Sequence, residues 1–249
     1  MFNFFVDRNS RQGDKYIITG SDCNHIKNVL RMREGDTLLV SNGKASDLCE
    51  ILDFDNDCVT VKIIEENYQG TNLPVEIYLF QGLPKSDKME LIIQKAVELG
   101  VSGIIPVEMN RCVVKLDPKK KKSKTARWQA IAESAAKQSK RTVIPEVFDV
   151  STYKEAMEKV KDLDLFMVPY ENKDGMQATK TALSEIKKGM KIGVLIGPEG
   201  GFEESEINTA TENGGKIISL GKRILRTETA AITAVGMCML YIEMNGESL

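Results

Sequence analysis

Histidine is almost absent from this chain: the 249 residues include a single one, His25. A catalytic triad of nucleophile, histidine and acid would have to use this residue. His25 stands in an expected helix near the start of the chain and not beside a Gly-x-Ser-x-Gly turn. We therefore expect a structural or polar-contact role for His25 rather than acid–base catalysis.

Cysteine is also scarce, with five residues that are far apart and never in Cys-x-x-Cys spacing. Zinc sites usually combine closely spaced cysteines and histidines, and a disulfide framework usually has an even number of cysteines. We therefore expect neither a metal site nor a disulfide framework. A reducing, cytoplasmic compartment suits such a chain best.

Long apolar runs are missing as well. A membrane-spanning helix needs about 20 predominantly apolar residues, and the sequence has no such run. The first seven residues, MFNFFVD, lack the basic region and long apolar core of a secretory signal. We accordingly expect no membrane partner and a cytoplasmic location.

The net charge of −2 does not by itself suggest a nucleic-acid partner. The charges are unevenly distributed, however. Residues 8–33 contain six Lys and Arg against two acids, and residues 111–141 contain eleven against two. Clusters of this kind can contact phosphates although the whole chain is acidic. We interpret the run Lys119 to Lys122, taken alone, as a solvated loop.

The pattern of elements changes near residue 70. Before it, short β-prone runs alternate with turns such as Gly35-Asp36 and Asn42-Gly43, and one helix is expected from about Asp22 to Met32. The polar stretch from Asn67 to Pro74 has the composition of a linker. We predict a small β-rich domain over residues 1–70 and a second domain over residues 71–249.

In the second domain, apolar runs alternate with segments of helical periodicity. The expected strands cover residues 75–81, 102–107, 144–148, 163–168, 192–196 and 216–220, and the expected helices include 88–99, 124–140, 176–188 and 227–244. Alternation of this kind favours an α/β domain with a parallel sheet between helices. The last helix is apolar nearly all the way round, so either its own domain or a second copy of the chain must cover it.

Two glycine-containing loops follow the last two expected strands. The first is Gly197-Pro198-Glu199-Gly200-Gly201, and the second begins at Leu220-Gly221. Ligands of open α/β sheets bind where strands end, and glycine lets the backbone come close to them. Neither loop matches the phosphate motifs of nucleotide sites, and Glu199 would repel a pyrophosphate. The loops indicate a site for a polar or cationic ligand, although the first motif alone could be a plain tight turn.

The order and spacing of these motifs resemble those of a known family, the SPOUT methyltransferases, and within it the RsmE family, which methylates uridine N3 in 16S ribosomal RNA. The resemblance covers nearly the whole chain. It is carried by Ile196 to Gly201 with Glu206-Ile207, by Leu220-Gly221 with Arg223 to Ala230, and by the supporting matches His25, Val29-Leu30-Arg31, Lys88-Met89-Glu90, Gln94-Lys95, Glu98 to Val101 and Arg127-Trp128.

The resemblance implies a fold and partners that the residue patterns alone do not. It implies a C-terminal SPOUT α/β domain with a deep trefoil knot and a mostly parallel sheet, preceded by a small N-terminal PUA-like β-barrel that binds RNA. It also implies S-adenosylmethionine as cofactor, ribosomal RNA or the small ribosomal subunit as partner, and a homodimer. Two alternatives stay open: a SPOUT enzyme acting on another RNA such as transfer RNA, and a non-catalytic RNA-binding module that kept the fold.

Candidate residues follow from the resemblance and from the chemistry. Since the uracil N3 proton must leave, a general base or an oxyanion stabiliser is needed, and no metal is required. The catalytic candidates are Glu199, Arg226 and Glu228. The cofactor-binding candidates are Leu195, Ile196, Gly197, Gly200, Leu220, Ile224 and Leu225. The RNA-contact candidates are Arg8, Arg11, Arg31, Arg33, Lys137, Lys140 and Arg141. Either glutamate could instead cap the helix that follows it.

Overall fold

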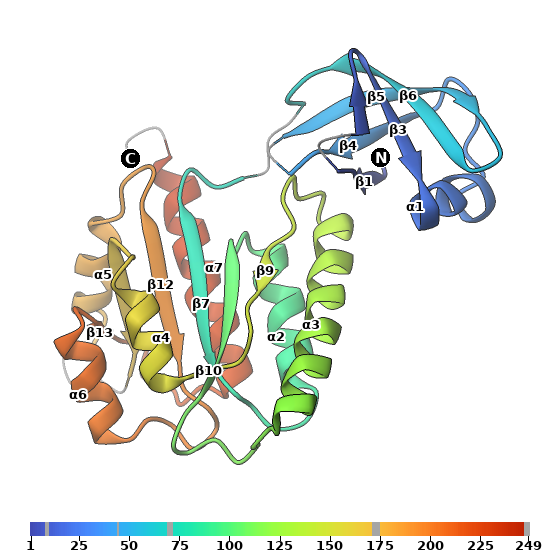
Figure 1. The fold of residues 1–249 in the computed structure, drawn as a ribbon. Coiled ribbons are helices and arrows are strands. Elements are labelled where there is room, and N and C mark those ends of the chain that lie inside the picture. Colours follow the sequence, from blue (N-terminus) through green and yellow to red (C-terminus); the bar gives the residue numbers. More distant parts are fainter. Residues whose placement is uncertain (8–9, 44, 69–71, 171–174, 247–249) are drawn as a thin grey trace. The chain divides into compact units, whose positions relative to one another are not determined.

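A computed structural model describes residues 1–7, 10–43, 45–68, 72–170 and 175–246. The chain forms two compact units, Met1–Asn72 with Ala136–Ile144, and Leu73–Ala135 with Pro145–Leu249 (Figure 1). The segment Ala136–Ile144 thus groups with the first unit, although it lies within the range predicted for the second domain. Arg8 lies outside the described residues.

The first unit is built on a six-stranded sheet. Its strands are β1 (Asn3–Phe5), β2 (Arg11–Gln12), β3 (Lys15–Thr19), β4 (Thr37–Ser41), β5 (Ser46–Phe54) and β6 (Cys58–Glu65). They are ordered β1-β4-β5-β6-β3-β2, with β1 parallel to β4 and the other pairs antiparallel. The expected helix begins two residues earlier and ends three residues earlier than predicted, and consists of α1 (Gly20–Asn24) followed by the π-helical η2 (His25–Val29).

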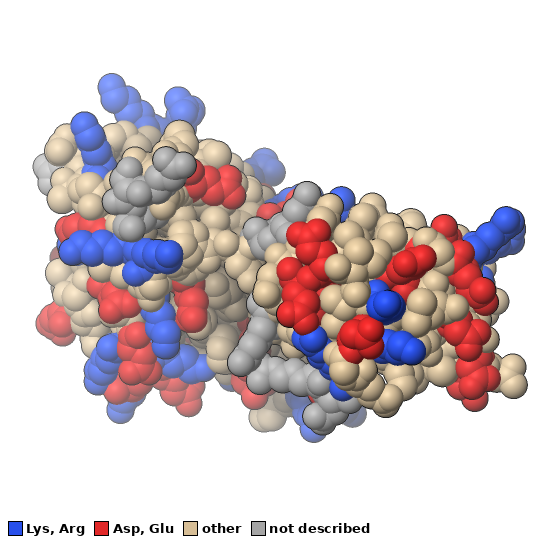
Figure 2. Space-filling model, turned by 90° about the horizontal axis from the view of Figure 1, so that it is seen from above, with Lys and Arg blue, Asp and Glu red and all other residues tan. Residues whose placement is uncertain are grey.

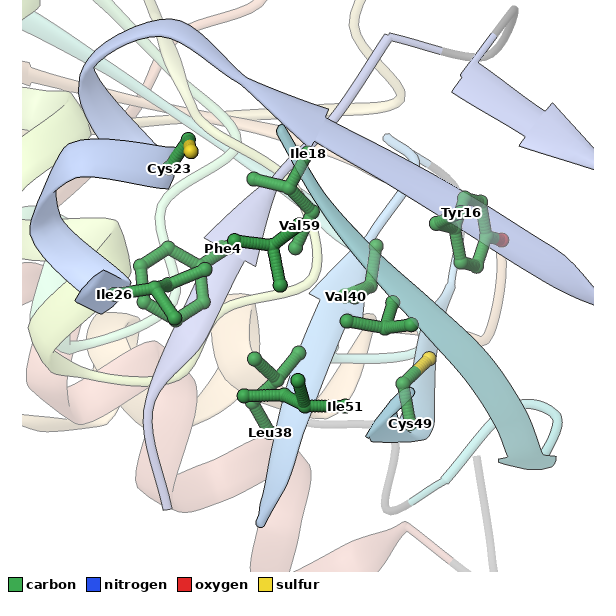
Figure 3. Packing of buried hydrophobic residues seen from close by; sticks show 11 residues of the cluster. Phe4, Tyr16, Ile18, Cys23, Ile26, Leu38, Val40, Cys49, Ile51 and Val59 are labelled. Carbon is green, nitrogen blue, oxygen red and sulfur yellow. The ribbon is translucent and has the colours of Figure 1, made fainter. Parts of the chain in front are cut away.

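The core of this unit lies between the strands and the short helix (Figure 3). Along β3, Tyr16 and Ile18 are buried while Lys15 and Thr19 are exposed, as the alternation of side chains along a strand requires. The Tyr16 hydroxyl donates a hydrogen bond of 2.6 Å to the buried carboxylate of Asp47, so these two polar groups satisfy each other inside the core. The ring of His25 packs edge-on against Phe4.

The second unit is an α/β domain with a parallel sheet, which confirms the predicted fold class. Its strands are β7 (Glu76–Gly82), β8 (Gly103–Glu108), β9 (Glu146–Val147), β10 (Ser151–Thr152), β11 (Leu165–Pro169), β12 (Lys191–Ile196) and β13 (Lys216–Ile218). The order is β10-β8-β7-β12-β11-β13, β9 pairs with β8, and every pair is parallel. The central strands β7 and β12 are buried along most of their length because helices cover the sheet.

The helices are α2 (Lys88–Glu98), α3 (Pro118–Gln138), α4 (Tyr153–Val160), α5 (Gln177–Ser184), α6 (Glu204–Glu212) and α7 (Thr227–Asn245). Figure 1 shows α4 on one face of the sheet and α2 and α7 on the other, where these two helices pack together. Among the described helices, α7 included, none has the length and apolar character needed to cross a bilayer.

The lysine run at residues 119–122 is helical, so its interpretation as a loop was wrong. It forms the first turns of α3, which starts six residues earlier than predicted from Trp128 and its apolar neighbours. Pro118 occupies the first helical position, where its missing N–H costs nothing, and the Asp117 carboxylate accepts a 2.8 Å hydrogen bond from the Lys120 amide. Because of this cap, the helix begins before the first residues that show apolar periodicity.

The segment between β13 and α7 is anchored to α5. The buried hydroxyl of Thr179 donates to the Ser219 carbonyl at 2.7 Å and accepts from the Ser219 amide at 2.9 Å. This pair of hydrogen bonds fixes the chain where it leaves β13 and turns toward α7. The trefoil knot implied for this region stays a prediction.

Candidate functional site

A pocket of about 410 Å³ opens at the carboxyl ends of the neighbouring parallel strands β11 and β12. Three segments line it: Pro169-Tyr170 after β11, the glycine loop after β12, and the segment around the start of α7. The lining residues are Pro169, Tyr170, Ile196, Gly197, Pro198, Glu199, Gly201, Phe202, Ile224, Leu225, Arg226, Thr227 and Ala230. The carboxyl end of a parallel sheet is where open α/β folds bind ligands.

Close packing requires glycine at one position of the first loop and at one position that faces the loop. A Cβ atom on Gly200 would lie 2.9 Å from the Cβ of Arg111 and 3.0 Å from its carbonyl oxygen. A Cβ atom on Gly82, at the end of β7, would lie 2.7 Å from the ring of Pro198. The loop therefore fits against the ends of β7 and β8 only because these two positions carry no side chain.

The loop after β8 holds the far end of the glycine loop. The Asn110 amide donates to Glu206 at 2.9 Å, and the Asn110 side chain donates to Glu203 at 2.8 Å. The same two glutamates form the capping box at the start of α6. The Arg111 guanidinium donates to the Gly200 carbonyl at 3.2 Å. Glu203 and Glu206 are thus committed to holding the backbone.

Thr227 connects the near end of the glycine loop to the start of α7. Its hydroxyl donates to the Gly197 carbonyl at 2.7 Å and accepts from the side-chain amide of Gln81 at 3.0 Å. Both Thr227 and Gln81 are buried. Gln81 was not among the predicted site residues, although a glutamine at the end of an otherwise apolar strand is a signal that could have identified it.

Lys88, the first residue of α2, bridges two of the predicted catalytic residues. Its ammonium nitrogen lies 3.0 Å from Oε1 of Glu199 and 3.2 Å from Oε2 of Glu228. The Lys85 amide also donates to Glu199, at 3.0 Å. Glu199 lines the pocket, whereas Glu228 lies beside it and shares the same ammonium group.

These contacts keep the bridge charged. The hydrogen bond to Glu199, followed by that to Glu228, raises the pKa of Lys88 above its ordinary value. Partial burial raises the pKa of Glu199, but hydrogen bonds from its own amide, from Lys88 and from the Lys85 amide outweigh burial, so the pKa lies below the usual 4.5. At neutral pH Glu199 is therefore a carboxylate that accepts hydrogen bonds and is a weak base.

The predicted cofactor residues are only partly brought together. Four of them, Ile196, Gly197, Ile224 and Leu225, line the pocket. Leu195 is buried within β12, Gly200 packs against Arg111, and Leu220 does not line the pocket. In the segment before α7, Ile224 is 97% exposed.

The predicted RNA contacts differ in their surroundings. Arg11 forms an ion pair with Glu66, and Lys137 lies 3.1 Å from Asp22. Arg31, Arg33 and Lys140 are exposed. Arg141 is only 6% exposed, and burial lowers its pKa to about 10, so its guanidinium is not displayed at the surface. Figure 2 shows acidic and basic side chains interspersed over the face in view.

Within the described residues, no group of three or more His, Cys, Asp and Glu side chains is arranged to hold a metal ion.

Comparisons with known proteins agree in both units. A family model of the RNA methyltransferase domain matches residues 71–239, and a model of the RNA methyltransferase PUA domain matches residues 18–64. The chain is 38% identical to ribosomal RNA small subunit methyltransferase E of Bacillus subtilis, with 98% of each chain covered.

Solved structures show the same similarity. A ribosomal RNA small subunit methyltransferase E from Neisseria gonorrhoeae, bound to S-adenosyl methionine, is 31% identical with a TM-score of 0.77, and the match covers 95% of this chain and 96% of that one. A putative methyltransferase from Legionella pneumophila, in complex with the same cofactor, is 29% identical with a TM-score of 0.79 and covers 96% and 97% of the two chains.

Proposed function

This chain belongs to the ribosomal RNA small subunit methyltransferase E family, and we propose that it transfers a methyl group from S-adenosylmethionine to N3 of a uridine in 16S ribosomal RNA. The observation that carries the proposal is the pocket at the ends of β11 and β12. It is lined by the glycine loop and by the segment before α7, the two stretches on which the family resemblance rests.

The residues of the pocket fit this cofactor. A volume of about 410 Å³ lies within the range of roughly 300–1,000 Å³ that is typical of small-molecule sites. Ile196 and Leu225 offer apolar surface to a purine, Glu199 offers a negative charge, and Arg226 offers a positive one. The purine of the cofactor matches this apolar surface, and the two charged side chains are left to act on the uracil. When bound, it supplies an electrophilic methyl group on a sulfonium.

The chain itself must present the uracil edge and manage the N3 proton. N3 lies on the Watson–Crick edge, so the base has to be unpaired or extruded before it enters the pocket. As the N3–H bond breaks and its proton passes to solvent water, negative charge spreads onto the neighbouring carbonyl oxygens. Arg226 lines the pocket and can stabilise that charge. We assign Glu199 the task of accepting the N3–H hydrogen bond and orienting the base, because its lowered pKa makes it a weak base.

We further propose that the first unit binds the RNA and that two copies of the chain pair through α7. The first unit matches a PUA domain of RNA methyltransferases. On α7, a second hollow of about 510 Å³ is almost entirely apolar, and Leu240 and Met244 beside it are 53% and 75% exposed. An exposed apolar face of this kind is typical of an interface between subunits. Measuring the mass of the chain in solution by light scattering, with L240E as the interface variant, tests the dimer.

The proposed activity is tested by transfer of labelled methyl from S-adenosylmethionine to small-subunit RNA taken from cells that lack this gene. Mass spectrometry of the digested RNA then identifies the product nucleoside. We expect 3-methyluridine at one site. Label in transfer RNA instead would refute the ribosomal substrate and keep the chemistry. Failure to bind the cofactor would leave only an RNA-binding module. If the cofactor binds but free RNA is not labelled, assembled subunits are the next substrate to test.

A further inference from the structure

The bridge between Lys88, Glu199 and Glu228 joins three segments that are distant in the sequence: the start of α2, the glycine loop and the start of α7. We propose that Lys88 is a positioning residue of the methyl transfer, which fixes the Glu199 carboxylate at the wall of the pocket by bridging it to Glu228. This inference rests on the proposed function, since it assigns a role within that reaction.

The two carboxylates need a cation between them. Both lie within 3.2 Å of one ammonium nitrogen, so they are close enough to repel each other if that nitrogen is removed. The carboxylates are also largely screened from water, since the side chains of Glu199 and Glu228 are 24% and 14% exposed. Without Lys88 the hydrogen bond from the Lys85 amide remains, but repulsion from Glu228 should turn the Glu199 carboxylate away from its place at the pocket wall.

The backbone of the glycine loop does not depend on this bridge. Thr227 holds the Gly197 carbonyl at one end of the loop, and Arg111 holds the Gly200 carbonyl at the other. Loss of Lys88 should therefore release the Glu199 side chain while the cofactor pocket stays formed. The expected defect is in the rate of transfer and not in the affinity for the cofactor.

The same helix offers a matched control. Lys95 of α2 forms an ion pair of 2.9 Å with Glu98, and neither residue lines the pocket. K88M and K95M each remove one ion-paired lysine from α2, but only K88M removes a contact to Glu199. K88R keeps a cation that can bridge the same two carboxylates.

The experiment measures kcat and KM for RNA, together with the Kd for S-adenosylmethionine by calorimetry. Misplacement of a reacting group by about 1 Å can cost on the order of 100-fold in rate, so K88M should lower kcat at least tenfold. KM and Kd should change less than threefold. K88R should recover most of the activity, and K95M should behave as wild type.

A double-mutant cycle tests whether Lys88 acts through Glu199. If it does, adding K88M to E199Q should cost nothing further, because the group that Lys88 positions is already neutral. Independent, multiplicative losses would overturn the proposal, as would a K88M variant with wild-type kcat. If K88M does not fold, as judged by circular dichroism, K88Q takes its place in the cycle. If the wild-type chain itself transfers no methyl group, the proposed function is refuted. A failure of the proposed function can thus be told apart from a failure of the positioning role of Lys88.

Discussion

Removing the hydroxyl of Thr227 should destabilise the second unit and weaken its pocket. This hydroxyl is the link between the Gly197 carbonyl and the buried amide of Gln81. T227V keeps the shape of the side chain and removes both hydrogen bonds. A buried hydrogen bond contributes about 1 kcal/mol net, and a partner left unsatisfied costs more. The amide of Gln81 keeps its second bond, to the Gly82 carbonyl. We therefore expect a loss of about 2–3 kcal/mol in the free energy of unfolding.

The fluorescence of Trp128 is a suitable probe, because this single tryptophan is buried in the second unit. With a urea m-value of about 2–3 kcal/mol per M, T227V should lower the unfolding midpoint by about 1 M. T227S is the control, since it keeps the hydroxyl and removes one methyl group, which should cost about 1 kcal/mol. The affinity for S-adenosylmethionine should fall in T227V and remain near wild type in T227S, because only T227V releases the Gly197 carbonyl.

A T227V variant that is no less stable than T227S would refute this reasoning. It would mean that the hydroxyl contributes nothing beyond its shape. The double variant Q81L/T227V adds a second check. Because the two side chains bond to each other, its loss of stability should be smaller than the sum of the losses in Q81L and T227V measured separately.

Three further predictions follow from the charges and thiols. Hydrogen bonds lower the pKa of Glu199 in the folded protein, so the contribution of this carboxylate to stability is present above about pH 4.5 and is lost as the pH falls through the folded-state pKa. The difference in urea midpoint between wild type and E199Q should therefore shrink from pH 7 to pH 3. Of the five cysteines, all of which the structure describes, only Cys58 is not buried, so one thiol should react rapidly with Ellman's reagent in the native protein, none in C58S and all five in urea. If Arg31 and Arg33 contact RNA phosphates, R31E/R33E should lower the slope of log affinity against log salt by about 1.4, at roughly 0.7 per phosphate of single-stranded RNA; an unchanged slope would exclude these contacts.

The sequence was sufficient to predict the α/β class and the position of the pocket. Both depend on short-range patterns: apolar runs alternating with helical periodicity, and glycines directly after strands. Ile196, Gly197 and Arg226 were predicted from these patterns together with the family resemblance, and all three line the pocket. The early start of α3 was also readable, since Asp117-Pro118 is a recognisable helix start. The four lysines that follow it are equally typical of a solvated loop, which is why the loop interpretation was wrong.

The contacts that hold the pocket could not be predicted in this way. Lys88 belongs to one of the supporting matches of the family resemblance, but more than 100 residues separate it from Glu199, so no local pattern predicts that the two side chains meet. Arg141 illustrates the same limit, because its position in a basic stretch suggested an RNA contact while the fold buries it. Local patterns report which residues share an element. Only the packing of elements decides which charges meet.

The glycine loop shows how the two kinds of information combine. Its glycines suggested an approach of the backbone to a ligand, whereas Gly200 is required by its packing against Arg111. The backbone of the loop is held by Arg111 after β8 and by Thr227 at the start of α7, while Lys88 at the start of α2 holds the Glu199 side chain. A wall fixed by several independent contacts loses little freedom when a ligand binds, so binding energy is not consumed in ordering it. The segment before α7 also lines the pocket, and Ile224 within it is 97% exposed. A ligand in this pocket would therefore gain its orientation from the glycine loop. For this reason the residues that hold that loop should affect the reaction, although most of them do not line the pocket.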